Sequence, residues 1–150
     1  MLAKTKTHVD KSTFTITFKR SLAATREAAF DAWTDPEQIK HWWDPTGVPL
    51  SGCAIDLRVG GAFQFTVASQ HAPPFAGTYR LIERPARLEF DAMGALGTVQ
   101  FERGGTESTE MTVRIRCASA EHLEQFVKLG VADGTDQTLD NLVAFVTRRA

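Results

Sequence analysis

The chain has 150 residues, of which 43% are hydrophobic and 23% are charged, and its formal net charge at pH 7 is -1. These proportions are those of an ordinary globular protein and exclude an intrinsically disordered chain. No apolar run approaches the roughly 20 residues of a membrane span, and the polar N-terminus lacks the apolar stretch of a secretory signal. We therefore expect one cytoplasmic domain over residues 1–150, with a real core and no membrane association.

The charged and sulfur-containing residues indicate no nucleic acid, metal or cofactor. The 17 lysines and arginines are scattered rather than gathered into a stripe that could follow phosphates. Cys53 and Cys117 lie far apart and outside any CxxC pattern, and the histidines have no metal-ligand spacing. We expect two buried thiols, no metal site, no cofactor and no nucleic-acid partner.

The first predicted element is a strand over residues 13–20, where phenylalanine and isoleucine alternate with threonine. A period of two places these residue types on opposite faces, so one face is buried and one is wet. Thr25 can then cap a helix. Asp35 restarts a second short helix with Pro36 at its first position, and the Trp42-Trp43 pair follows at helical spacing.

A glycine pair divides the next apolar stretch. Residues 55–59 and 62–67 flank Gly60-Gly61, a two-residue connection suited to a primed turn in which φ is positive. These segments are therefore predicted to be two antiparallel strands of a tight hairpin.

Three polar residues near this hairpin are candidate ligand contacts. Asp56 and Arg58 share one face of the expected strand, and we interpret them as an ion pair that fixes the hairpin, with a ligand-orienting pair as the alternative. His71 lies in a proline-rich loop over residues 68–75, where an imidazole could act as an acid, a base or a ligand contact. A lone loop histidine without a carboxylate or nucleophile partner is, however, more often exposed to solvent.

Four further strands are predicted at the intervals of an antiparallel meander. They span about residues 77–83, 86–92, 97–103 and 107–117. In the last of them, apolar residues alternate with threonine and arginine, so only one face of the sheet requires burial. Helices must cover that face.

The C-terminal third is predicted to hold two helices rather than one. Apolar residues before and after Gly130 would fall on nearly opposite faces of a single straight helix. A break at Gly130 gives helices over about residues 120–129 and 131–149. The second helix also carries an acidic edge, which we interpret as solvated and favoured by the helix dipole: Asp133, Asp136 and Asp140.

The order of these elements predicts an α+β fold. We expect one curved antiparallel sheet of about six to seven strands, wrapped around a long C-terminal helix, with two short helices after the first strand. Such a sheet encloses space between itself and the helix.

Several motifs along nearly the whole chain carry a resemblance to a known family. They are Ala32-Trp33-Thr34-Asp35-Pro36, Trp42-Trp43, Asp56-Leu57-Arg58-Val59-Gly60-Gly61, Gly77-Thr78-Tyr79, and the stretch from Gly130 to Leu142. With these motifs the chain resembles the activator-of-heat-shock-chaperone-ATPase homologue family of the START-like superfamily, also called SRPBCC, helix-grip or Bet v I-like. The resemblance implies the helix-grip fold and a ligand cavity. Where similar proteins commonly carry Gly-Trp, this chain has Gly134-Thr135, which predicts a larger or more polar cavity if Thr135 faces inward.

The candidate ligand-binding residues are the aromatic and small polar side chains expected to face that cavity. They are Trp42, Trp43, Phe63, Phe65, Phe75, Tyr79, Phe90, Phe101, Thr135 and Thr138. The alternative for the tryptophan pair is a structural one, in which it anchors a short helix on the sheet.

Three functions follow from these expectations, and no catalytic motif is present to favour an enzyme. The first is binding of a hydrophobic small molecule in an apolar cavity between sheet and helix. The second, implied by the resemblance, is a module that interacts with a heat-shock chaperone and activates its ATPase. The third is a cyclase or dehydratase acting on a hydrophobic aromatic substrate, as occurs in the wider superfamily. A monomer and a homodimer are both compatible with the sequence.

Overall fold

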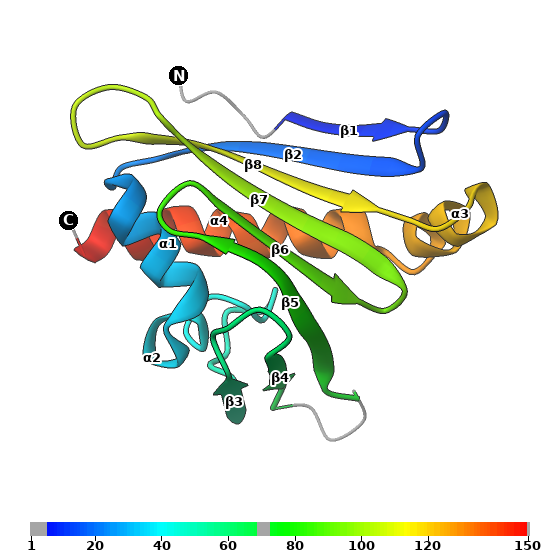
Figure 1. Ribbon diagram of the computed structural model, residues 1–150, viewed down its shortest axis with the longest axis horizontal. Helices are drawn as coiled ribbons and strands as arrows, with labels where there is room; N and C mark the ends of the chain where they lie inside the picture. Colours follow the sequence, from blue (N-terminus) through cyan, green and yellow to red (C-terminus); the bar gives the residue numbers. More distant parts are fainter. Residues whose placement is uncertain (1–5, 69–72, 150) are drawn as a thin grey trace.

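A computed structural model describes residues 6–68 and 73–149 of the chain, and these form an α+β fold (Figure 1). Within them, eight antiparallel strands make one sheet in the order β1-β2-β8-β7-β6-β5-β4-β3. The strands are β1 (Lys6–Asp10), β2 (Thr15–Leu22), β3 (Gly52–Ile55), β4 (Ala62–Thr66), β5 (Phe75–Glu83), β6 (Arg87–Ala92), β7 (Ala95–Arg103) and β8 (Thr109–Arg116). The helices are α1 (Arg26–Thr34), α2 (Pro36–Ile39), α3 (Ala120–Lys128) and α4 (Val131–Arg149).

The long helix α4 lies across one face of the curved sheet, with α1 near its C-terminal end and α3 near its N-terminal end (Figure 1). This arrangement confirms the predicted fold, although the sheet has more strands than expected. The additional strand is β1, a polar edge strand that pairs with β2 alone. Its sequence carries little apolar alternation because edge strands bury little surface.

Local capping explains why the helices begin and end where they do. The Thr25 hydroxyl accepts a hydrogen bond from the backbone N–H of Ala28 at 3.1 Å, as predicted for the α1 N-cap. The Asp35 side chain likewise caps α2 by accepting from the backbone N–H of Glu37 at 2.9 Å. Gly130, with φ +79°, separates α3 from α4 and confirms the predicted break.

The two antiparallel strands predicted around the glycine pair are present as β3 and β4, but the predicted two-residue turn is wrong. Strand β3 ends at Ile55, and residues 56–61 form a loop instead of continuing the strand. Two short turns determine the path of this loop. The backbone N–H of Arg58 donates to the Asp56 carbonyl at 2.9 Å, and the backbone N–H of Gly61 donates to the Arg58 carbonyl at 2.8 Å. The backbone N–H of Gly60 then bonds to Tyr79 on β5, so the glycines join β5 rather than closing a two-residue turn.

Two further expectations need correction. The second short helix ends at Ile39, so Trp42 and Trp43 lie in the turn that follows it. The acidic edge of α4 is not simply solvated, because the guanidinium of Arg20 lies 3.3 Å from both the Asp136 and Asp140 carboxylates. Arg20 is on the helix-facing side of β2 and only 7% exposed, so this ion pair fastens α4 to the sheet.

Candidate functional site

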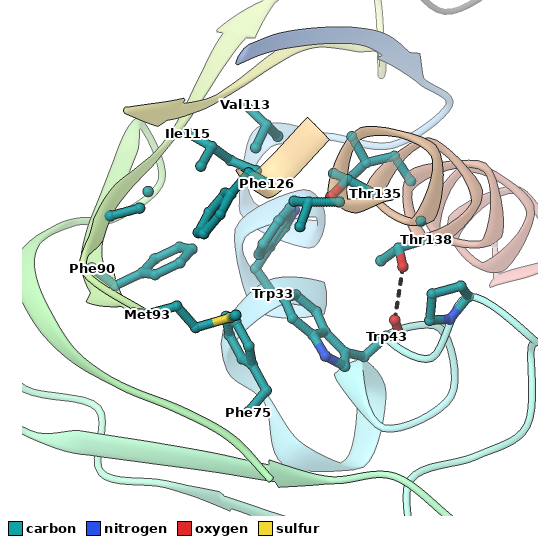
Figure 2. Close-up of a pocket in the computed structure, with 17 residues that line it drawn as sticks. Trp33, Trp43, Phe75, Phe90, Met93, Val113, Ile115, Phe126, Thr135 and Thr138 are labelled. Carbon is teal, nitrogen blue, oxygen red and sulfur yellow. Dashed lines mark hydrogen bonds between the residues drawn. The ribbon is translucent and has the colours of Figure 1, made fainter. Parts of the chain in front are cut away.

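A cavity of about 270 Å³ lies between the sheet and the N-terminal half of α4. Figure 2 shows Phe75, Phe90 and Met93 on one side of this space and Thr135 and Thr138 of α4 on the other. Pro45 and Met93 are exposed and lie at its rim. The lining residues are Trp33, Trp43, Pro45, Phe75, Phe90, Ala92, Met93, Ala95, Gly97, Val113, Ile115, Phe126, Val131, Gly134, Thr135, Thr138 and Leu139.

Glycines on neighbouring strands position the aromatic wall of the cavity. A Cβ added to Gly97 on β7 would lie 2.5 Å from the ring of Phe90, and one added to Gly77 on β5 would lie 2.5 Å from the ring of Phe63. Each ring therefore occupies the space that a side chain at the glycine position would otherwise fill. The Phe63 and Phe90 rings then meet edge to face with centroids 5.5 Å apart.

The two adjacent tryptophans have different roles. Trp42 is fully buried, and its indole N–H donates to the Ala32 carbonyl at 3.1 Å, so it anchors the turn on α1 and does not line the cavity. Trp43 does line the cavity, with its ring centroid 5.0 Å from those of Phe65 and Phe75. Trp42 thus has the anchoring role that was predicted as the structural alternative for the pair. Trp43 has the other predicted role, because its ring lines the cavity.

Helix α4 holds the turn that carries Trp43. The Thr138 hydroxyl donates to the Trp43 carbonyl at 2.9 Å (Figure 2), and the Asn141 side chain donates to the Asp44 carbonyl at 3.0 Å. These bonds satisfy backbone carbonyls that no regular element pairs. They also fix the distance between the tryptophan wall and the helix wall of the cavity.

The remaining predicted residues lie in several places. Phe63, Phe65 and Tyr79 border a second void of about 10 Å³, which is too small for an organic ligand, so they form a packed aromatic cluster behind the main cavity. Phe101 is 2% exposed against Phe30, outside both spaces.

Two of the three candidate polar contacts, Asp56 and Arg58, do not join the cavity lining. Asp56 and Arg58 form the predicted ion pair at 2.9 Å, but they do so in the exposed loop between β3 and β4. His71 lies outside the described residues. Thr135 and Thr138 are the two predicted polar residues that line the cavity.

Sequence reasoning missed much of the lining. Trp33, Phe126 and Val131 border the cavity, but none of them was among the predicted ligand-binding residues. Met93 is another lining residue that was not predicted, and it lies in a turn with φ 54°. A signal that could have identified this end of the fold is the pairing of small residues on facing elements, Gly97 on β7 and Gly134 on α4.

The side chains that line the cavity are uncharged. None of the described lining residues has a side chain that ionises near neutral pH, and the polar side-chain groups come from threonine and tryptophan. Behind the cavity, burial raises the pKa of the Tyr79 phenol well above its ordinary value. Among the described residues, no cluster of three histidine, cysteine or acidic side chains could hold a metal ion. In the same part of the chain, no helix is both long and apolar enough to span a membrane.

A sheet that grips a long C-terminal helix over an apolar cavity defines the helix-grip, START-like class of proteins. Within that class, residues 23–147 match the family model of the Activator of Hsp90 ATPase homolog 1-like proteins, and the chain belongs to that family. No curated protein matches the sequence.

Solved structures agree with this fold. A Rhodobacter sphaeroides protein superposes with a TM-score of 0.84 at 22% identity, covering 97% of this chain and 99% of that one. Ms6760 from Mycobacterium smegmatis gives a TM-score of 0.81 at 21% identity, with 97% and 98% of the chains covered. CalU16 from Micromonospora echinospora is similar at 25% identity with a TM-score of 0.64, over 88% and 75% of the chains.

Proposed function

We propose that this protein binds a neutral, mainly apolar small molecule in the cavity between the sheet and α4. The observation that carries the proposal is the cavity itself, about 270 Å³ of space lined by aromatic and aliphatic side chains beside an exposed rim. Apolar pockets with a few polar groups are the usual form of small-molecule sites. A well-packed core of this size would hold few voids larger than a water molecule.

The volume suggests the size of the ligand. An engineered protein cavity of about 150 Å³ holds one benzene ring. A space of about 270 Å³ is therefore suited to a molecule of about two fused rings. The aromatic wall formed by Trp43, Phe75 and Phe90 favours flat rings, which can stack or meet those side chains edge to face.

Calorimetric titration with a series of neutral ring compounds tests the proposal. We expect 2-isopropenylnaphthalene to bind more tightly than the one-ring α-methylstyrene or the four-ring pyrene, with the negative heat-capacity change of apolar burial. The matched control is Thr135→Trp, which places a large ring in the cavity and should weaken binding at least about tenfold. Thermal unfolding would establish that the variant is folded. Failure of every compound to bind the wild-type protein, or equal binding by Thr135→Trp, would contradict the proposal.

The family match supports a second candidate, activation of a heat-shock chaperone ATPase. The test is the ATPase rate of a purified Hsp90-type chaperone as this protein is added in increasing excess. We expect saturable stimulation if this function applies. A rate that does not change, together with no association in sedimentation, would exclude it.

A further inference from the structure

The Thr135 hydroxyl in the cavity lining differs from the other helical threonine hydroxyls. Other helical threonines use their hydroxyls: Thr34 donates to Phe30 at 3.0 Å, Thr147 to Val143 at 2.8 Å, and Thr138 to Trp43 at 2.9 Å. The hydroxyl of Thr135 makes no hydrogen bond within the described residues, and Figure 2 shows its oxygen on the cavity side of α4. This hydroxyl is therefore free to bond to a molecule in the cavity.

A second unpartnered group does not compete for that molecule. The indole N–H of Trp33 also lacks a hydrogen-bond partner among the described residues, but its nitrogen is closed to a water-sized probe. The Trp33 ring packs edge to face against the rings of Trp42 and Trp43, with ring centroids 5.0 and 6.3 Å apart. A ligand can therefore reach the Thr135 hydroxyl, but not the Trp33 N–H, without rearrangement of the tryptophans.

The chemistry of the lining limits what can bond to Thr135. A carboxylate or ammonium group would be buried without an opposite charge, because no described lining residue is ionised, and an unpaired buried charge is very unfavourable. A pure hydrocarbon would leave the hydroxyl desolvated and unpaired, which also costs free energy. An uncharged oxygen avoids both penalties.

We infer that the ligand is a compound of about two fused rings that carries one uncharged oxygen, a ketone or a hydroxyl, hydrogen-bonded to Thr135. This inference rests on the proposed function, since it concerns the same cavity. It assigns to Thr135 the choice between oxygenated and hydrocarbon ligands, while the aromatic wall sets the choice of ring size.

A pair of ligands with the same shape tests the inference. 2-Acetylnaphthalene and 2-isopropenylnaphthalene differ in a C=O against a C=CH₂ group, and each is titrated into wild type, Thr135→Val and Thr135→Ser. We expect Thr135→Val to weaken the ketone about three- to tenfold and to bind the alkene at least as tightly as wild type, because valine removes the unpaired hydroxyl. Thr135→Ser retains the hydroxyl and should retain the ketone preference. Comparing variants cancels the different hydration of the two ligands.

Two matched controls separate this effect from general damage to the helix. Thr147→Val makes the same substitution on an exposed part of α4 away from the cavity lining, and both ligands should bind it as they bind wild type. Thr138→Val removes a bond that holds the Trp43 turn, and it should weaken both ligands equally.

The outcomes distinguish the inference from the proposed function beneath it. Equal effects of Thr135→Val on ketone and alkene would overturn the inference and leave cavity binding intact. Failure of both ligands to bind the wild-type protein would overturn the proposed function, and the inference with it. Selective loss of the ketone, restored by Thr135→Ser, would support both.

Discussion

The space between α4 and the sheet is filled at one end of the helix and open at the other. Near the C-terminal half, Leu142 and Val146 are buried in the same apolar core as Phe18 and Phe30. Near the N-terminal half, Thr135 and its neighbours border a cavity of about 270 Å³ instead. Both ends are formed by α4 and the same sheet, so the difference in packing comes from the side chains at each end.

The comparison also shows how a helix can remain fixed above empty space. Where the cavity reduces apolar packing, polar contacts fasten α4 on both sides. Arg20 binds Asp136 and Asp140 from β2, while Thr138 and Asn141 bind the backbone of the tryptophan turn. Hydrogen bonds of this kind hold geometry without filling volume, which leaves the space available to a ligand.

The largest expected effect compares two buried leucines on α4, each no more than 1% exposed. Leu142→Ala at the filled end should lower the free energy of unfolding by about 2–5 kcal/mol. Leu139→Ala should cost at least about 1 kcal/mol less, because Leu139 already borders the cavity and has fewer neighbouring atoms to lose. Urea unfolding measures both. Equal losses would mean that the cavity end is as well packed as the filled end.

The polar fastening of α4 can be broken at Arg20. Arg20→Met keeps an apolar stem of similar length but removes the guanidinium, and should lower the free energy of unfolding by about 1–3 kcal/mol. The control is Asp140→Asn, whose side chain is 66% exposed and should change stability by less than about 1 kcal/mol. If Arg20→Met is as stable as wild type, the ion pair does not hold the helix.

The pH dependence of stability tests whether water is excluded from the Tyr79 phenol in the aromatic cluster behind the cavity. Its buried phenol has a raised pKa, so the unfolded chain ionises first as pH rises. The stability that this contributes is present below about pH 10 and should fall above it, by at most about 1.4 kcal/mol per pH unit.

Tyr79 is the only tyrosine, so tyrosinate absorbance during unfolding reports it directly. Cys53 and Cys117 also have pKa values raised by burial, which act in the same direction. Tyr79→Phe is therefore the control, and it should flatten the alkaline loss of stability. Tyrosinate absorbance in the folded protein near pH 10 would mean that the cluster is wet.

The smallest effect on stability is expected at the rim. Met93 lines the cavity while 59% exposed, so Met93→Ala should change the free energy of unfolding by less than about 0.5 kcal/mol. It should nevertheless speed dissociation of a bound naphthalene derivative, because less apolar surface covers the mouth. Stopped-flow displacement measures this rate. An unchanged rate would place the ligand's exit elsewhere.

The sequence predicted the fold more fully than the site, for physical reasons. Capping at Thr25 and Asp35 and the break at Gly130 are local, and each left a recognisable residue type at its position. Residues 56–59 of the loop between β3 and β4 were predicted as strand because apolar and charged residues alternate there. Its actual course depends on a hydrogen bond between Gly60 and distant Tyr79, which no local pattern records.

The cavity depends on contacts between distant elements in the same way. Trp42 and Trp43 are adjacent in sequence, yet one anchors the core and the other lines the cavity, because the turn after α2 directs them apart. Arg20 and Asp136 pair across 116 positions of sequence, so an acidic helix edge alone could not reveal its partner. Thr135 was found because it stands where similar proteins commonly carry a tryptophan, and the structure places it in the cavity lining.

The contrast between the two ends of α4 can be tested most directly by methyl NMR of the wild-type protein during titration with 2-acetylnaphthalene. The account predicts large shift changes for the methyl groups of Val113, Ile115 and Val131, which line the cavity. It predicts little change for Leu22 and Leu142, which are no more than 1% exposed and lie outside the cavity lining. Changes spread evenly over both ends, or confined to the exposed surface, would contradict it.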